Sequence, residues 1–245
     1  MLVSVITTAV DSARTRHLPT ELRTIAPWAT GDGPHVMVFD TPCSGYKGKS
    51  DGNECVQRNL FGNHQKCARR ILASGAPFGL VLESDVQFDG ALLQAHMDGV
   101  LAWAERNGGA FDILLLGGAA LADPNNALND EHVARVVEYV AFAHAIVYSR
   151  DFCKRFVRWE WPGMHFDNWI GSRRGDLRIF MSRHALATVH HRRHRTMMER
   201  YRTASGFLLA SKVSKLHWII MSFVVACAIL FVMLSACVCL VLARP

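Results

Sequence analysis

The stretch FGLVLESD at residues 78–85 decides how this chain is expected to fold. Its first five residues are apolar without alternation, which is typical of a strand buried on both faces of a sheet. The apolar run ends abruptly in Glu83-Ser84-Asp85. Ligands of open α/β sheets bind in the crevice beyond the carboxyl ends of the strands, so we expect these two carboxylates at a ligand-binding edge.

Short apolar runs and segments of helical period alternate on both sides of this strand. We expect strands at residues 2–7, 35–39, 78–82, 111–116, 136–140 and 145–148. We expect helices at residues 14–25, 55–74, 89–107 and 149–159, with caps at Gly75, Asp89 and Ser149, and a loop at 40–53. The alternation predicts an α/β fold with a mostly parallel central sheet.

Glu83 and Asp85 are the most informative chemical feature of the sequence. Two neighbouring carboxylates repel each other unless a cation neutralises them, and hard divalent ions prefer oxygen ligands. Such an ion would in turn hold a diphosphate. The alternative is that both acids only solvate the loop before the next helix, for which Asp89 is the N-cap.

Four blocks of the sequence resemble the family 25 glycosyltransferases, which include lipooligosaccharide and collagen galactosyltransferases. In that family a helix with a Ser-His pair precedes a strand ending in Leu-Glu-Asp-Asp-Val-x-Phe, and this chain has NHQKCA at 63–68 and FGLVLESDVQF at 78–88. Looser matches follow in the family's order at 111–117, 143–149 and 165–170. Only the Leu-Glu-x-Asp-Val-x-Phe block is specific by itself.

The resemblance implies a GT-A-like α/β/α sandwich that binds a nucleotide sugar through a divalent metal, usually manganese. Asp85 matches the metal-binding carboxylate, and Glu83 matches the acid that supports the metal or the ribose. Many GT-A enzymes add a late histidine to the metal shell, and His190 is the candidate here. The alternative for His190 is that residues 190–194 form a face that contacts lipid headgroups.

The resemblance also implies roles for three residues outside the acidic motif. Asp167 matches an acid near the acceptor, a candidate general base, although it could equally cap a short helix. His64 matches the helical histidine and Arg14 a possible remnant of the arginine after the first strand, both at the nucleotide-sugar site; His64 could also be a satisfied, partly buried histidine. Ser84 and Asn63 depart from the family's pattern.

Taken together, these features predict a hexosyltransferase that moves a sugar from a nucleotide sugar to a glycan, lipid or protein hydroxyl. The first alternative is a non-catalytic membrane module that keeps a degenerate GT-A-like core. A metal-dependent phosphohydrolase is a third possibility, but it would need more acids and histidines near the sheet edge.

The C-terminal part of the sequence is typical of a membrane anchor. Residues 218–242 contain no charged side chain, and about 20 apolar helical residues suffice to cross a bilayer. We expect a globular domain at 1–190, a basic juxtamembrane linker at 191–216, a transmembrane helix at 217–242 and a short tail at 243–245. The cations before the helix outnumber those after it, which predicts a tail-anchored protein whose folded part faces the cytoplasm.

Charge and cysteine content narrow the expected partners. The net charge is +6, but much of the excess lies within residues 190–215, so anionic lipid headgroups are the expected partner and nucleic acid is not. Cys43, Cys55, Cys67 and Cys153 precede the expected anchor without any CxxC pair. A structural zinc site is therefore not expected, and isolated buried thiols are.

Overall fold

The computed structural model describes residues 1–7, 17–30, 35–38, 49–141, 144–173 and 175–189. These residues belong to one compact unit, Met1–Arg192. Arg14, His190 and the expected linker, transmembrane helix and tail lie outside the described residues. None of the helices within the described ranges combines the length and the apolarity that a bilayer crossing needs.

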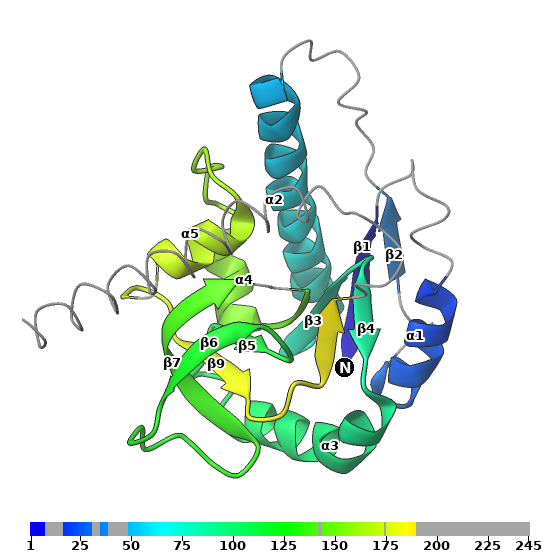
Figure 1. Cartoon of the computed structure of the whole chain (residues 1–245), viewed down its shortest axis with the longest axis vertical. Coiled ribbons are helices and arrows are strands. Elements are labelled where there is room, and N and C mark those ends of the chain that lie inside the picture. The colour runs from blue at the N-terminus through cyan, green and yellow to red at the C-terminus, as the bar shows by residue number, and fades with distance from the viewer. Residues whose placement is uncertain (8–16, 31–34, 39–48, 142–143, 174, 190–245) are drawn as a thin grey trace, which may run out of the picture. The chain divides into compact units, whose positions relative to one another are not determined.

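A mixed sheet of eight strands in the order β2-β1-β3-β8-β5-β9-β7-β6 forms the centre of this unit (Figure 1). Its strands are β1 (Leu2–Thr7), β2 (His35–Val38), β3 (Phe78–Glu83), β5 (Ile113–Leu115), β6 (Ala119–Asp123), β7 (Val133–Ala141), β8 (Ala145–Ser149) and β9 (Ile179–Ser182). A separate two-stranded sheet pairs β4 (Val86–Phe88) with β10 (Ala187–Val189).

The prediction of a mostly parallel sheet is correct in that most strands share one direction. It is wrong in that many neighbouring strands pair antiparallel. β8 and β7 run antiparallel to their neighbours, so the other six strands share one direction. The physical reason is the chain between β5 and β8, whose described residues contain no helix. Parallel neighbours need a long crossover connection, whereas strands joined by short links pair antiparallel.

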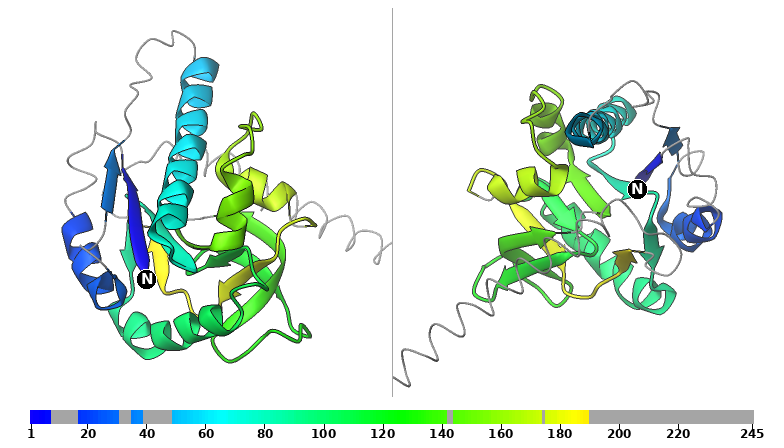
Figure 2. Two further views of the ribbon diagram at one scale, coloured as in Figure 1. Left: turned by 180° about the vertical axis from the view of Figure 1, so that it is seen from behind. Right: turned by 45° about the horizontal axis from the view of Figure 1, so that its top comes forward.

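Helices cover both faces of the central sheet, as the α/β/α prediction requires (Figure 2). One face carries α1 (Leu18–Ile25), the short 3₁₀ helix Ala26–Trp28 and α3 (Gly90–Arg106). The other face carries α2 (Lys49–Ser74), α4 (Arg150–Phe156) and α5 (Phe166–Ser172). Strand β3 contributes side chains to the hydrophobic core on both faces of the sheet. Leu80 and Leu82 pack with α3, while Val81 packs with α2.

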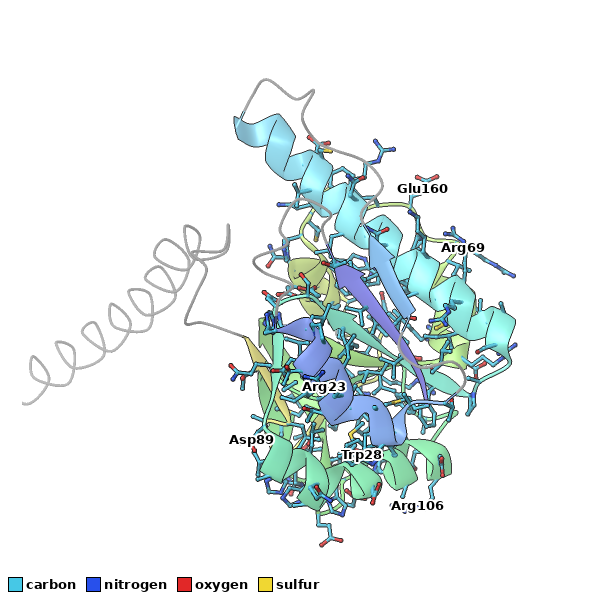
Figure 3. The ribbon with its side chains drawn as sticks, turned by 90° about the vertical axis from the view of Figure 1, so that its right-hand side faces the viewer. Arg23, Trp28, Arg69, Asp89, Arg106 and Glu160 are labelled. Atoms are coloured by element: carbon cyan, nitrogen blue, oxygen red, sulfur yellow. The ribbon has the colours of Figure 1, made fainter. Side chains whose placement is uncertain are left out.

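The predicted caps are confirmed. The Asp89 carboxylate accepts hydrogen bonds from the backbone N–H groups of Ala91 and Leu92 and starts α3, whose two ends are marked by Asp89 and Arg106 in Figure 3. The Ser149 hydroxyl accepts from the N–H of Phe152 and starts α4. Gly75 ends α2 with a φ of 75°, a conformation that favours glycine.

Several boundaries and short strands differ from the prediction. Residues 49–53 belong to α2 and not to a loop, and α4 ends at Phe156 and not at 159. Strands β4, β6, β9 and β10 were not expected. Runs of three to five residues bury too little surface to produce a recognisable pattern, and they are strands here because a neighbouring strand pairs with them.

The cysteines follow the prediction only in part. Cys67 and Cys153 are buried thiols outside any disulfide, and burial raises the pKa of each to about 12, so both are unreactive. Cys55 is disulfide-bonded, so the expectation of isolated thiols is wrong for this residue. The sequence spacing of the cysteines does not predict this bond, because a disulfide depends on the distance between two cysteines in the folded chain.

Candidate metal centre

Glu83, Asp85 and His144 meet at the carboxyl end of β3. Glu83 is the last residue of β3, Asp85 lies in the turn that leads to β4, and His144 directly precedes β8. The antiparallel register pairs Leu82 with Ala145, and the Glu83 N–H donates to the His144 carbonyl over 2.8 Å. The pairing of β3 with β8 therefore places the imidazole beside the acidic turn.

Side-chain distances within this group are short. His144 Nδ1 lies 3.4 Å from Asp85 Oδ1 and 3.7 Å from Glu83 Oε2. One ligand atom from each residue lies within 4.8 Å of the other two. The carboxylates are partly exposed, at 21% for Glu83 and 25% for Asp85, while the His144 side chain is 7% exposed. The group is thus open to a ligand on its carboxylate side.

The charges of this group depend on one another. Burial alone would lower the pKa of His144, but Asp85 and Glu83 outweigh it and raise the pKa to about 10. Burial alone would raise the pKa of Glu83, but hydrogen bonding to His144 and His64 holds it well below its usual value. At neutral pH the site therefore contains an imidazolium between two carboxylates.

A second histidine approaches Glu83 from the helical layer. His64 lies on α2, is fully buried, and stacks on the Phe166 ring with centroids 4.0 Å apart. Its Nδ1 is 2.8 Å from the Tyr148 hydroxyl, and its Nε2 is 3.5 Å from Glu83 Oε1. If the phenol donates to Nδ1, the Nε2 proton faces the carboxylate, so Tyr148 and His64 orient Glu83.

The residues present fit a divalent metal ion. If a metal displaces the proton of His144, the two carboxylates and the neutral imidazole form the oxygen and nitrogen set that Mn²⁺ and similar ions accept. Asp85 Oδ1 is buried and, among the described residues, lies 3.4 Å from His144 Nδ1 without a hydrogen bond of good geometry. A bound cation would take a direct bond from this oxygen in place of that longer ion pair.

Replacing Tyr148 by phenylalanine tests the support for Glu83. The variant leaves His64 Nδ1 buried without its donor, so we expect a loss of about 1–2 kcal/mol in unfolding free energy. Loss of a hydrogen-bonded support of a ligand typically weakens metal affinity by about 10- to 100-fold. The measurement is the Mn²⁺ concentration that gives half-maximal thermal stabilisation; an unchanged midpoint would show that Tyr148 serves packing alone.

The structure brings together part of the predicted site. Glu83 and Asp85 converge as expected, and His64 joins them through Glu83. Asp167 is not a helix cap, because His165 is the N-cap of α5 and Asp167 lies in its first turn, 7% exposed. Its carboxylate is close enough to contribute to raising the pKa of Tyr148, for which burial is the main cause.

Sequence reasoning missed two residues at this edge. His144 falls within the looser block at 143–149 and received no role, although a histidine directly before an apolar strand was a usable signal. Thr7 ends β1, one residue after Ile6, which pairs with Glu83. Its hydroxyl is buried without a hydrogen-bond partner among the described residues, so it is available to a ligand at this edge.

Comparisons with known proteins do not assign the chain to a family. No family model matches it, and no curated protein does. Among solved structures, mannose-1-phosphate geranyltransferase from Thermus thermophilus matches over 74% of this chain and 73% of its own, with 10% identity and a TM-score of 0.45. A glycosyltransferase involved in glycosylation of the major capsid of PBCV-1 matches over 72% and 68%, with 9% identity and a TM-score of 0.38.

A197 from STIV is a further structural match, over 74% of this chain and 81% of its own, with 11% identity and a TM-score of 0.38. Similarities of this size do not determine a function. The functional argument therefore depends on the residues of the site.

Proposed function

We propose that this chain is a membrane-tethered, metal-dependent glycosyltransferase that moves a sugar from a nucleotide sugar to a hydroxyl group. The observation that supports this best is the convergence of Glu83, Asp85 and His144 at the carboxyl edge of the central sheet. The reaction class comes from the four sequence blocks that resemble the family 25 glycosyltransferases.

Each residue at the edge has a role in this proposal. Glu83, Asp85 and His144 would hold the metal, with Mn²⁺ as the proposed ion, and His64 keeps Glu83 in place. A bound divalent ion offsets the negative charge that develops on a departing nucleoside diphosphate. The Thr7 hydroxyl, at the end of the neighbouring strand, is positioned to hydrogen-bond the nucleotide.

Asp167 is the proposed general base for the acceptor. It would accept the proton of the attacking hydroxyl while that oxygen forms the new bond to the sugar. Phe166, the residue before it, packs on His64, which places the start of α5 next to the metal centre. Arg14 and His190 stay predictions, as donor-binding and metal-binding residues respectively.

The membrane tether rests on the sequence alone. The uncharged residues 218–242 and the basic segment before them support an anchor next to anionic headgroups. The positive-inside bias favours a folded part in the cytoplasm. The disulfide of Cys55 argues for the opposite orientation, because disulfides persist mainly in oxidising compartments.

One observation favours a second candidate, a non-catalytic module with a degenerate core. The His144 imidazolium already neutralises part of the charge on Glu83 and Asp85, so the acidic group needs no metal to be stable. In that case the edge would be a structural ion-pair cluster. The two candidates differ in whether a metal and a nucleotide bind there.

Thermal unfolding of the full chain in detergent separates them. For the transferase we expect UDP or GDP to raise the melting temperature only when Mn²⁺ is present, because a ligand that binds the folded state alone stabilises it. At 100 times the dissociation constant this stabilisation is about 2.7 kcal/mol. Asp85→Asn should abolish the stabilisation, since the amide cannot replace a charged metal ligand.

Asp89→Asn is the matched control for Asp85→Asn. It makes the same change of charge four residues away, and asparagine keeps the N-cap of α3. We expect the Asp89 variant to retain the full Mn²⁺-dependent shift. If no nucleoside diphosphate shifts the melting temperature of the wild type with any divalent ion, the transferase proposal is wrong and the degenerate core is favoured.

A further inference from the structure

A groove of about 660 Å³ lies between α2 and the segment that follows α4. Asn59 and Asn63 line it from the helix, and Trp159 and Trp161 line it from the facing segment. Glu160, between the two tryptophans, also contributes to the lining and is labelled beside α2 in Figure 3. None of these residues belongs to the metal centre.

The aromatic wall of this groove is held in place by α2 itself. The Gln65 side-chain amide donates to the carbonyls of Phe156 and Trp159, over 2.9 and 2.7 Å. The Trp159 ring packs edge to face on Trp169, with centroids 5.3 Å apart. The Trp161 indole N–H donates to the carbonyl of Met164. The groove is therefore formed before any ligand arrives, which lowers the entropic cost of binding.

Asn63 indicates that the groove takes a polar ligand. This residue is 3% exposed, lines the groove, and its side-chain amide makes no hydrogen bond within the described part of the chain. The amide faces the groove and has both donors and an acceptor to offer a ligand there. A ligand with hydroxyl groups would satisfy it.

The combination of amides and indoles fits a carbohydrate. The apolar C–H face of a sugar ring packs on an indole, while its hydroxyls hydrogen-bond to an amide side chain such as that of Asn63. A lipid tail would leave the Asn63 amide buried without a partner, at a cost of about one to three kcal/mol.

The groove also lies close to the reaction edge. Asn63 directly precedes His64, whose Nε2 is 3.5 Å from the Glu83 carboxylate. The segment with Trp161 continues into α5, which carries Asp167. The groove and the metal centre are therefore both built on the same part of α2.

We propose that this groove binds the carbohydrate part of the acceptor, so that the substrate is a glycan. The role as an acceptor site rests on the proposed transferase function, whereas the carbohydrate chemistry rests on the groove itself. The assignment narrows the acceptor from any hydroxyl compound to one with a sugar chain next to the reacting hydroxyl.

Binding of soluble oligosaccharides to the full chain in detergent tests this proposal. The probes are a panel of neutral, amino-sugar and uronic-acid oligosaccharides, followed by intrinsic tryptophan fluorescence and by calorimetry. We expect at least one to bind, and we expect Trp161→Ala and Asn63→Leu each to raise its dissociation constant by about tenfold or more. Asn63→Leu keeps the size of the side chain and removes its hydrogen-bonding groups.

Trp28→Ala is the matched control for the tryptophan variant. Trp28 lies on the opposite face of the sheet, where its indole donates to Asp98. The Trp28→Ala variant should therefore leave oligosaccharide binding unchanged. Both groove variants should show the same cooperative thermal unfolding transition as the wild type, which shows that they fold whether or not a nucleoside diphosphate binds.

Two results would overturn the groove assignment: no oligosaccharide of the panel binds, or the bound one binds the Trp161 and Asn63 variants as tightly as the wild type. Failure of the transferase proposal is distinguishable from either. A chain that binds oligosaccharide in the groove but no nucleoside diphosphate would be a carbohydrate-binding module, with the groove assignment intact and the transferase assignment wrong.

Discussion

Replacing Asp167 by asparagine is expected to lower the rate of sugar transfer by about 10²- to 10⁴-fold, the usual contribution of a general base. Asparagine has the same shape but cannot accept the proton of the attacking hydroxyl. Asp167 is buried in the first turn of α5, beside the Phe166 ring that stacks on His64. The measurement is the transfer rate with nucleotide sugar and Mn²⁺ at saturating acceptor.

Donor binding should separate this role from a structural one. Asp167 is not one of the three residues that converge as a metal site, so the Mn²⁺-dependent shift with UDP or GDP should be unchanged in the variant. Asp151→Asn is the control, because Asp151 is also the acid in the first turn of a short helix, α4. Equal effects of the two variants would mean that Asp167 only supports its helix through the dipole.

The metal centre shows how far sequence reasoning could reach. Glu83 and Asp85 were predictable because an apolar run that ends in acids shows where a buried strand stops. His144 is 59 positions from Asp85 along the chain and reaches it through the pairing of β8 with β3. That pairing is antiparallel in a sheet where six of the eight strands share one direction, and no local pattern specifies it.

The elements of the fold likewise divide into those that local sequence determines and those that depend on distant residues. Asp89, Gly75 and Ser149 were identified correctly because a cap acts on backbone groups within four residues. Strands β4 and β10 were missed because each has three residues and depends on the other for its hydrogen bonds. The need for glycine at position 117 also depends on a residue that is distant in sequence. A Cβ at Gly117 would lie 1.8 Å from the Ala187 carbonyl oxygen.

Asp112→Ala is expected to have the largest effect on stability. The Asp112 side chain is 1% exposed, and its carboxylate accepts from the Arg178 backbone N–H over 2.9 Å and from the guanidinium groups of Arg178 and Arg155. These bonds join β5 to the segment before β9 and to α4. Removing the carboxylate leaves several donors without a partner, so we expect the unfolding free energy to fall by about 3 kcal/mol. This value is at the lower end of the range for broken buried ion pairs, because both arginines are partly exposed.

The pH dependence of this contribution identifies its origin. Burial alone would raise the pKa of Asp112, but the hydrogen bonds from Arg178 and Arg155 outweigh it and lower the pKa below the ordinary 3.8. A carboxyl whose pKa is lower in the folded state stabilises the fold above its unfolded pKa and loses that effect as the pH falls through the folded pKa. Asp112→Asn, which keeps the shape without the charge, should therefore differ from the wild type at pH 7 and approach it as the pH falls from 3.8 through the lower folded-state pKa. Chemical denaturation of both proteins across this range is the measurement, and a difference that stays constant with pH would show that shape and hydrogen bonding, and not charge, carry the effect.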